Sequence, residues 1–187
     1  MSLRRRSAAL VGGLGLLLLA QGCWIPSKAW LAHVLVAHAW ERALAGEARP
    51  RPWPWADTWP VARLTAPRLE VERFVLAGSS GRTLAFGPGH VETTSPPGAA
   101  GNSVLAGHRD TSFAFLADLE VGDDLSLTTP DGREHHYQIT WTAVVDQADT
   151  RSLEPTPEKA LTLVTCWPFD AVRPGGRGRY VVRAEGG

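Results

Sequence analysis

The sequence predicts a mainly β fold, a closed barrel or a sandwich, with roughly seven or more short strands. Two observations support this prediction. Apolar and polar residues alternate with period two in short runs such as VARLTAP and LEVERFVLAG, which begin at Val61. The chain also has 14 prolines, 19 glycines and one methionine, a composition that is typical of a turn-rich β protein rather than a helix bundle.

The expected strands follow one another closely within residues 61–187. They are the runs VARLTAP, LEVERFVLAG, NSVLAGH, DDLSLTTP, REHHYQITWTAVVD, LTLVTC and RYVVRAE. The Asp131-Gly132 pair predicts a hairpin turn between two of them. Only residues 112–119 resemble a helical turn, so helices are expected to contribute little to this domain.

The first 26 residues have the pattern of a membrane anchor. Arg4, Arg5 and Arg6 precede an apolar run that extends to Ile25. The run is just long enough to cross a bilayer as a helix, and the arginines keep their end in the cytoplasm. A cleaved signal peptide is the alternative, because the most apolar part is short. We expect a single-pass protein of the cytoplasmic membrane whose remaining residues lie on the extracytoplasmic or periplasmic side.

Residues 27–60 are expected to join this anchor to the barrel. The run SKAWLAHVLVAHAWERALAGE has apolar residues at helical spacing and ends near Gly46, which predicts an amphipathic helix. RPRPWPWADTWP follows, and prolines at this density exclude a helix or the interior of a sheet. Its tryptophans predict a strap on the domain surface or at the membrane interface, with an aromatic peptide-binding groove as the alternative.

Charge and metal-ligand patterns exclude several function classes. The chain has 19 basic and 19 acidic residues and no formal net charge, so nothing indicates a nucleic-acid partner. His135 and His136 are adjacent on an expected strand, face opposite sides and cannot bind one metal ion together. We expect neither a metal site nor a cofactor. Cys23 lacks the flanking residues of a lipidation site and is interpreted as a small apolar residue of the anchor.

Three polar residues stand at the ends of expected strands. His108 closes the run LAGH, Cys166 closes LTLVTC, and Arg179 opens RYVVR. A thiol, an imidazole and a guanidinium form a minimal set for acyl transfer. The sulfur attacks a carbonyl, the histidine moves protons, and the arginine binds the peptide or the oxyanion. On residue types alone, a buried structural cysteine and a surface histidine remain the alternative.

The residues around these three resemble the sortase family of cysteine transpeptidases. The run TLVTC that ends at Cys166 matches the family signature TLxTC, His108 lies upstream at a strand end, and Arg179 begins the last strand. The resemblance covers about residues 61–187 and implies a closed barrel of about eight strands. The Trp-Pro-Phe run after the cysteine, the segment at 87–90 and the strap look like the small single-domain sortases of Gram-negative bacteria, which resemble class D enzymes.

The resemblance implies a membrane-anchored enzyme that cleaves a C-terminal sorting signal of LPXTG type. Cys166 would attack the carbonyl of the signal's threonine and form a thioester, from which an amine acceptor would release the carried protein. His108 would protonate the departing amine and deprotonate the incoming one. Arg179 would hold substrate carbonyls and the developing negative charge. The acidic cluster with which some class A sortases bind calcium is not evident, so no metal is implied.

The resemblance and the local pattern also name secondary candidates. Thr165 is expected to shape the substrate groove, and Trp167 is expected to contact substrate. His90 follows Gly-Pro-Gly in an expected turn and is either a further substrate contact or a surface histidine. Arg177 lies among glycines, where the backbone is too free to hold a side chain in place, so Arg179 on a regular strand is the expected arginine.

Two other functions are compatible with an exported thiol domain. A cell-envelope thiol hydrolase of the papain-like class normally places its cysteine before its histidine and at a helix start, whereas this chain has the opposite order with the cysteine on a strand. A membrane-tethered barrel could also serve as a non-catalytic adaptor. The presence of all three polar residues argues against this adaptor.

Overall fold

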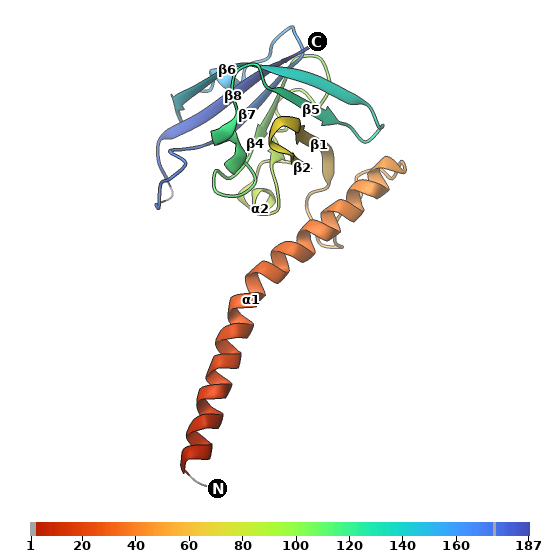
Figure 1. Ribbon diagram of the computed structural model, residues 1–187. Coiled ribbons are helices and arrows are strands. Elements are labelled where there is room, and N and C mark those ends of the chain that lie inside the picture. The colour runs from red at the N-terminus through yellow and green to blue at the C-terminus, as the bar shows by residue number, and fades with distance from the viewer. Residues whose placement is uncertain (1–2, 174) are drawn as a thin grey trace.

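A long helix leads into a closed β-barrel in the computed structural model (Figure 1). The structure describes residues 3–173 and 175–187, with side chains at residues 21, 22, 24, 27–173 and 175–187. Helix α1 (Leu3–Leu44) extends away from the barrel at its N-terminal end, and only its last turns lie against the strands. The closed barrel predicted from the sequence is confirmed.

Eight strands form the barrel in the described residues, in the order β1-β2-β3-β4-β7-β8-β6-β5. Pairing of β1 with β5 closes the sheet. The strands are β1 (Pro60–Ala66), β2 (Val71–Ala77), β3 (Gly89–His90), β4 (Asn102–Ala106), β5 (Asp124–Thr128), β6 (Glu134–Asp146), β7 (Ala160–Trp167) and β8 (Gly178–Gly186). Seven of them match expected strands. The turn expected at 87–90 instead contains β3, which pairs with β2 and β4.

Short helices occupy some of the connections. They are η1 (Pro67–Leu69), α2 (Gly81–Leu84), η2 (Ala114–Asp118) and η3 (Arg151–Leu153). The helical turn expected at 112–119 corresponds to η2, and the other short helices were not expected. The predicted hairpin turn is confirmed, because β5 and β6 pair on either side of Gly132, whose φ is +79°. A positive φ of this size favours glycine.

The barrel interior is filled by one face of each long strand. Leu64, Val75, Leu105, Leu163 and Val182 come from five different strands, and each is at most 1% exposed. Successive side chains in a strand point to opposite faces, so the period-two pattern of the sequence places these residues inside. Burial of each large aliphatic side chain contributes roughly 1.5–3 kcal/mol, which makes this core the main source of stability.

Two strand pairings bring the predicted catalytic residues together. β4 runs parallel to β7, with Ala106 opposite Val164, so both strands end at the same edge of the sheet. β7 runs antiparallel to β8, with Cys166 opposite Arg179. The segment after β4, the end of β7 and the start of β8 therefore meet at one end of the barrel.

The last turns of α1 pack on the outside of the barrel. Val36, Ala39, Trp40 and Ala43 are buried and have the spacing of a single helix face, which lies against β1 and β2. The Trp40 ring lies 6.2 Å from that of Phe74. The helix ends at Leu44, close to the predicted stop, as Gly46 adopts a φ of +92°.

The proline-rich strap lies along the domain surface. Trp53 meets Phe86 edge-on with ring centroids 4.8 Å apart, and the Arg49 guanidinium lies 5.1 Å from the Trp59 ring. Trp55 remains 82% exposed. Trp53 and Trp59 therefore each contact a neighbouring side chain, whereas Trp55 is left in contact with solvent.

Most side chains of the anchor expected at residues 1–26 lie outside the described ones. The backbone is helical from Leu3. No helix in the described part of the chain combines the length and the apolarity of a membrane span.

We predict that Trp40→Ala destabilises the protein by about 3–5 kcal/mol, the usual cost of removing a fully buried tryptophan. Trp30 is the matched control, because it lies on the same helix and is 68% exposed. Trp30→Ala should change the free energy of unfolding by less than about 0.5 kcal/mol. Urea unfolding of the full chain in detergent, followed by near-UV circular dichroism, measures both values. Equal effects of the two variants would show that the helix end does not pack on the barrel.

Candidate active site

Cys166 lies near the end of β7 and is a free, half-buried thiol. Leu161 and Leu163 of the same strand belong to the core. Alternation along the strand then directs Thr165 to the interior and Cys166 to the outer face. The thiol is thus carried by a supported strand and faces the outside of the barrel.

Thr165 joins the Cys166 strand to the segment that carries His108. Its side chain is buried, and Oγ1 donates a hydrogen bond of 2.7 Å to the carbonyl of Gly107. The Gly107 N–H donates to the carbonyl of Val164 at 3.2 Å. The Thr165 hydroxyl thus fixes the backbone immediately before His108. The expected role of Thr165 in shaping the substrate groove stays a prediction.

His108 is exposed and follows the last paired residue of the β4 segment. Its N–H donates to Ser112 Oγ at 3.2 Å, and its carbonyl accepts from the N–H of Phe113 at 2.9 Å. A Cβ atom at Gly107 would lie 2.7 Å from the Phe113 ring, so only glycine permits this tight packing. The backbone of His108 is therefore held firmly while its imidazole faces outward.

Arg179 lies directly across from Cys166 in the β7–β8 pair. Opposed residues in an antiparallel pair share a face of the sheet, so the guanidinium and the thiol are on the same side. Nη1 of Arg179 donates to the carbonyls of Gly176 and Gly178, each at 2.8 Å, and Nη2 donates to Gln147 Oε1 at 3.2 Å. These acceptors are neutral, so the cation is oriented without being neutralised.

Arg177 has a different setting. Its Nε lies 3.1 Å from Asp146 Oδ2 in an ion pair, and its side chain is largely exposed. The Ala148 N–H and the Arg177 guanidinium hold the pKa of Asp146 below its ordinary value. Arg177 is thus already paired with a carboxylate at the end of β6, whereas the strand position opposite Cys166 belongs to Arg179.

Trp167 belongs to an aromatic cluster beside the thiol. Its ring stacks on Tyr180 at 5.8 Å and meets Phe169 edge-on at 5.6 Å, and Phe169 and Tyr180 pack against the core. The Trp167 side chain remains 36% exposed. The cluster closes this end of the barrel, and the exposed part of Trp167 is available for the substrate contact that the sequence predicts.

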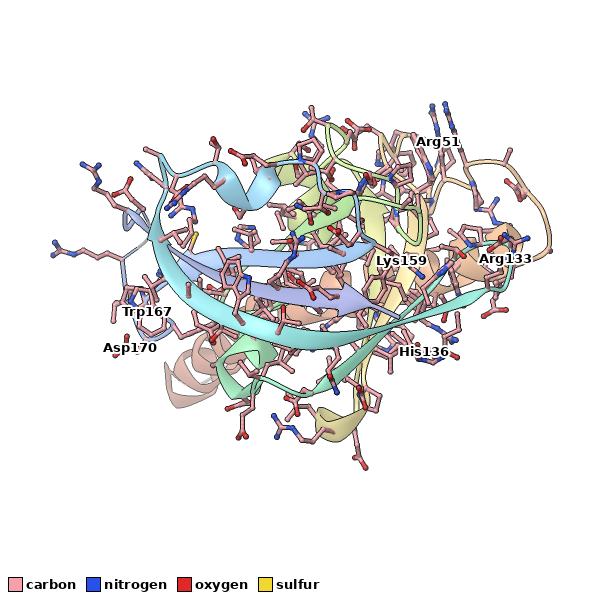
Figure 2. The ribbon with its side chains drawn as sticks, turned by 90° about the horizontal axis from the view of Figure 1, so that it is seen from above. Arg51, Arg133, His136, Lys159, Trp167 and Asp170 are labelled. Atoms are coloured by element: carbon pink, nitrogen blue, oxygen red, sulfur yellow. The ribbon has the colours of Figure 1, made fainter. Side chains whose placement is uncertain are left out.

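His90 is not a surface histidine, so that alternative is wrong. It lies in β3, is 8% exposed, and its Nε2 is 2.9 Å from the carbonyl of Ser95. It lines a cavity of about 810 Å³ together with Arg133, and this cavity includes none of the three predicted catalytic residues. Figure 2 shows Arg133 toward the end of the barrel opposite Trp167. The structure therefore does not bring His90 together with Cys166.

A second cavity, of about 490 Å³, lies on the same outer face as Cys166. Thr162 and Arg183 contribute to it from β7 and β8, β6 supplies Trp141, Ala143 and Val145, and the loop 149–156 forms its other wall. Thr162 precedes Cys166 by four positions, about 13 Å along an extended strand. The cavity can therefore receive the upstream part of an extended chain whose reacting carbonyl lies at the thiol.

A polar network that the sequence did not suggest holds the wall of this cavity. Asn102 Nδ2 donates to the carbonyls of Ser152 and Glu154 at 2.9 and 3.1 Å, and Thr162 Oγ1 donates to Asn102 Oδ1 at 2.7 Å. Arg183 Nη1 donates to Thr162 Oγ1 at 3.1 Å. Burial lowers the pKa of Arg183 below its ordinary value. The network ties the loop to the outer face of β4, β7 and β8.

The site consists of the thiol of Cys166, the guanidinium of Arg179 on the neighbouring strand, and the segment after β4 that carries the imidazole of His108. Among the side chains that the structure describes, no three of His, Cys, Asp or Glu gather into a possible metal site. Nucleophilic attack by sulfur, with proton transfer and anion stabilisation beside it, is the chemistry that these three groups support.

Known sequences match the part of the chain that forms the barrel and carries these three groups. The family model of the sortase domain matches residues 64–186. Sortase D of Bacillus subtilis is 37% identical over 120 residues, a match that covers 64% of this chain and 60% of that protein. Sortase A of Listeria monocytogenes is 28% identical over 110 residues and is covered over 49% of its length. The chain thus spans less than two thirds of each of these relatives.

Solved structures share the fold. A Clostridium perfringens sortase D transpeptidase aligns with a TM-score of 0.61 and 31% identity, over 68% of this chain and 79% of that one. Sortase A from Corynebacterium diphtheriae aligns with a TM-score of 0.64 and 28% identity, over 71% of this chain and 63% of that one. The matched domain, the shared barrel and the thiol at the end of β7 lead to one conclusion: the chain belongs to the sortase family.

Proposed function

We propose that this chain is a cysteine transpeptidase that cleaves a C-terminal LPXTG-like sorting signal and transfers the carried protein to an amine acceptor. The observation that carries the proposal is the register of the three strands. Arg179 lies opposite Cys166 across β7 and β8, and the His108 segment is fastened to the same end of β7. Membership of the sortase family supports the same reaction.

The first half of the reaction acylates the enzyme. The Cys166 sulfur, as thiolate, attacks the carbonyl carbon of the signal's threonine, and a tetrahedral intermediate with a negatively charged oxygen forms. The intermediate collapses, the carbon–nitrogen bond breaks, and the imidazolium of His108 protonates the departing amine. The product is a thioester between the carried protein and Cys166, together with the released signal.

The second half transfers the acyl group. The acceptor amine loses a proton to the His108 imidazole and attacks the thioester carbonyl. The carbon–sulfur bond then breaks, the sulfur leaves with the electron pair, and a new amide remains. If water attacks instead of an amine, the product is a free carboxylic acid, which is the outcome expected of a thiol hydrolase.

Arg179 stabilises the negative oxygen of both tetrahedral intermediates. Its neutral hydrogen-bond acceptors leave its positive charge available. A preoriented cation in a partly buried site lowers the free energy of a developing anion without reorganising during the reaction. The planar fork of donors also suits substrate carbonyls on the outer face.

The sorting signal binds in an extended form along the outer face of β7. Its threonine lies at Cys166, and the three residues before it extend about 10 Å. This reach leads toward the cavity lined by Thr162, where the apolar part of the β6 wall, Ala143 and Val145, suits an aliphatic side chain of the signal. Trp167, which is partly exposed, is the next residue of β7 after Cys166 and lies at the end of the strand.

We further propose that α1 anchors the enzyme in the cytoplasmic membrane, with the barrel on the extracytoplasmic side. The arginines at positions 4–6 before the apolar run support this orientation. Trp24 is 62% exposed, with the Lys28 ammonium 4.7 Å from its ring centroid, and Trp30 is exposed one to two turns further on. Exposed tryptophans beside a lysine are typical of the membrane–water interface.

Cys166→Ala should abolish both hydrolysis and amine transfer of an LPXTG-like peptide, because Cys166 is the group that forms the thioester in this mechanism. Cys23→Ala is the matched control, since it removes the other cysteine of the chain and should leave both rates within about twofold of the wild type. Chromatography of the cleaved peptide, with and without an added amine, measures the two reactions. Turnover by the Cys166→Ala protein would contradict the mechanism.

Arg179→Ala and Arg179→Lys should each lower kcat/KM by about a hundredfold or more, the scale expected for loss of an oxyanion donor. Arg177→Ala should lower it only a few-fold, because Arg177 is paired with Asp146. Steady-state kinetics on the three variants compare the two arginines directly. An inactive Arg177→Ala protein beside an active Arg179→Ala protein would show that Arg177, not Arg179, binds the oxyanion.

A further inference from the structure

We propose that Arg109 is a positioning residue for this reaction. It fastens the β7–β8 connection, residues 168–177, to the loop that carries His108. The inference rests on the proposed function, because it assigns Arg109 a role in the same site. Arg109 does not itself contact the reacting atoms in this role. It acts through the segment that leads from Cys166 to Arg179.

The contacts of Arg109 cross between the two segments of the site. Its Nη2 donates to the carbonyl of Ala171 at 2.8 Å and to that of Arg173 at 3.2 Å. Arg109 is the residue after His108, whereas the two carbonyls lie more than sixty positions later in the chain. A charged donor bonded to neutral carbonyls is stronger than a pair of neutral groups, so these bonds are suited to holding a segment in place.

The middle of the β7–β8 connection has little other support. Val172 is 98% exposed, and Arg173 is exposed as well. The connection is held at its start by Phe169 in the aromatic cluster and by a bond of 3.4 Å from the Ala171 N–H to the carbonyl of Pro168. At its end, Arg179 donates to Gly176, and the Gln147 N–H donates to the carbonyl of Arg177 at 2.7 Å. A segment with few buried apolar contacts opens at low free energy, so bonds to its backbone largely decide its position.

These bonds link the two sides of the site in one series of contacts. The series runs from the His108 loop through the Arg109 guanidinium to the carbonyls of the connection, and ends at Gly176, which accepts from Arg179 Nη1. A shift of the connection therefore moves an acceptor that orients the oxyanion-binding guanidinium. Misplacement of a reacting group by about 1 Å can cost about a hundredfold in rate.

The burial of Arg109 supports a fixed position. Its Nη1 is buried and has no hydrogen-bond partner among the described residues. Burial of a charged group with incomplete hydrogen bonding costs free energy, so a guanidinium with only a structural surface role would be expected to turn outward. The side chain instead keeps Nη1 buried and directs Nη2 at the two backbone carbonyls of the connection.

The test uses the full-length protein and compares Arg109→Ala and Arg109→Lys with Arg173→Ala. Arg173 is the matched control, because it lies in the connection and contributes only its carbonyl to the contact, which the alanine retains. Hydrogen exchange of the amides of residues 169–173 and 175–177 reports the fastening without any substrate. Steady-state kinetics on a sorting-signal peptide report kcat and KM separately, and the melting temperature reports global stability.

For Arg109→Ala we expect exchange in the connection to be about tenfold faster or more, with exchange in the barrel strands unchanged. We expect kcat to fall roughly 10- to 100-fold with little change in KM or in the melting temperature. Arg109→Lys keeps the charge without the planar fork and should be intermediate in both measurements. Arg173→Ala should resemble the wild type.

Three results would overturn the inference. Unchanged exchange in Arg109→Ala would show that the guanidinium does not fasten the connection. Faster exchange with an unchanged kcat would show that the connection does not position the site. If the wild-type protein processes no sorting-signal peptide, the proposed function fails, and the positioning role of Arg109 fails with it. The exchange measurement needs no substrate and still shows whether Arg109 fastens the connection.

Discussion

The parallel pairing of β4 with β7 is the constraint on which the site depends. Parallel strands end at the same edge of a sheet, so the residues that follow β4 and those that end β7 emerge side by side. The buried bond from Thr165 to the carbonyl of Gly107 then fixes their relative height. The antiparallel pairing of β7 with β8 adds Arg179 opposite Cys166. The chemistry is thus set by strand register, and a slip of one residue in β7 would turn the thiol into the core.

Support for this register comes from both faces of the sheet. On the inside, Leu163 and its neighbours from the other strands fill the barrel, and the aromatic cluster around Trp167 closes the end beside the thiol. On the outside, Asn102 and Thr162 tie the loop 149–156 to the strands. Cys166 and Arg179 therefore stand on paired strands, and the loop that forms one wall of the neighbouring cavity is held to those strands by the bonds of Asn102.

Local patterns in the sequence predicted most of the fold. Alternation, short apolar runs and turn signals together predicted seven of the strands. The run TLVTC predicted Cys166 as the nucleophile through a family resemblance. Other features depend on contacts between distant residues. A two-residue strand such as β3 is too short to show a period, so His90 was assigned to a turn. Helical spacing predicted the end of α1 but not that Trp40 packs on the barrel. The contact of Arg109 with Ala171 joins segments whose proximity only the strand order reveals.

The central claim is that the Cys166 sulfur becomes acylated by the sorting signal. The most direct measurement is mass spectrometry of the full-length protein after brief incubation with a library of LPXTG-like peptides and no added amine. The account predicts a mass increase equal to the peptide up to and including its threonine, located by proteolysis on the fragment that contains Cys166 and removed by hydroxylamine as a thioester should be. An adduct on any other residue, or peptide cleavage without an adduct that amines can discharge, would contradict it.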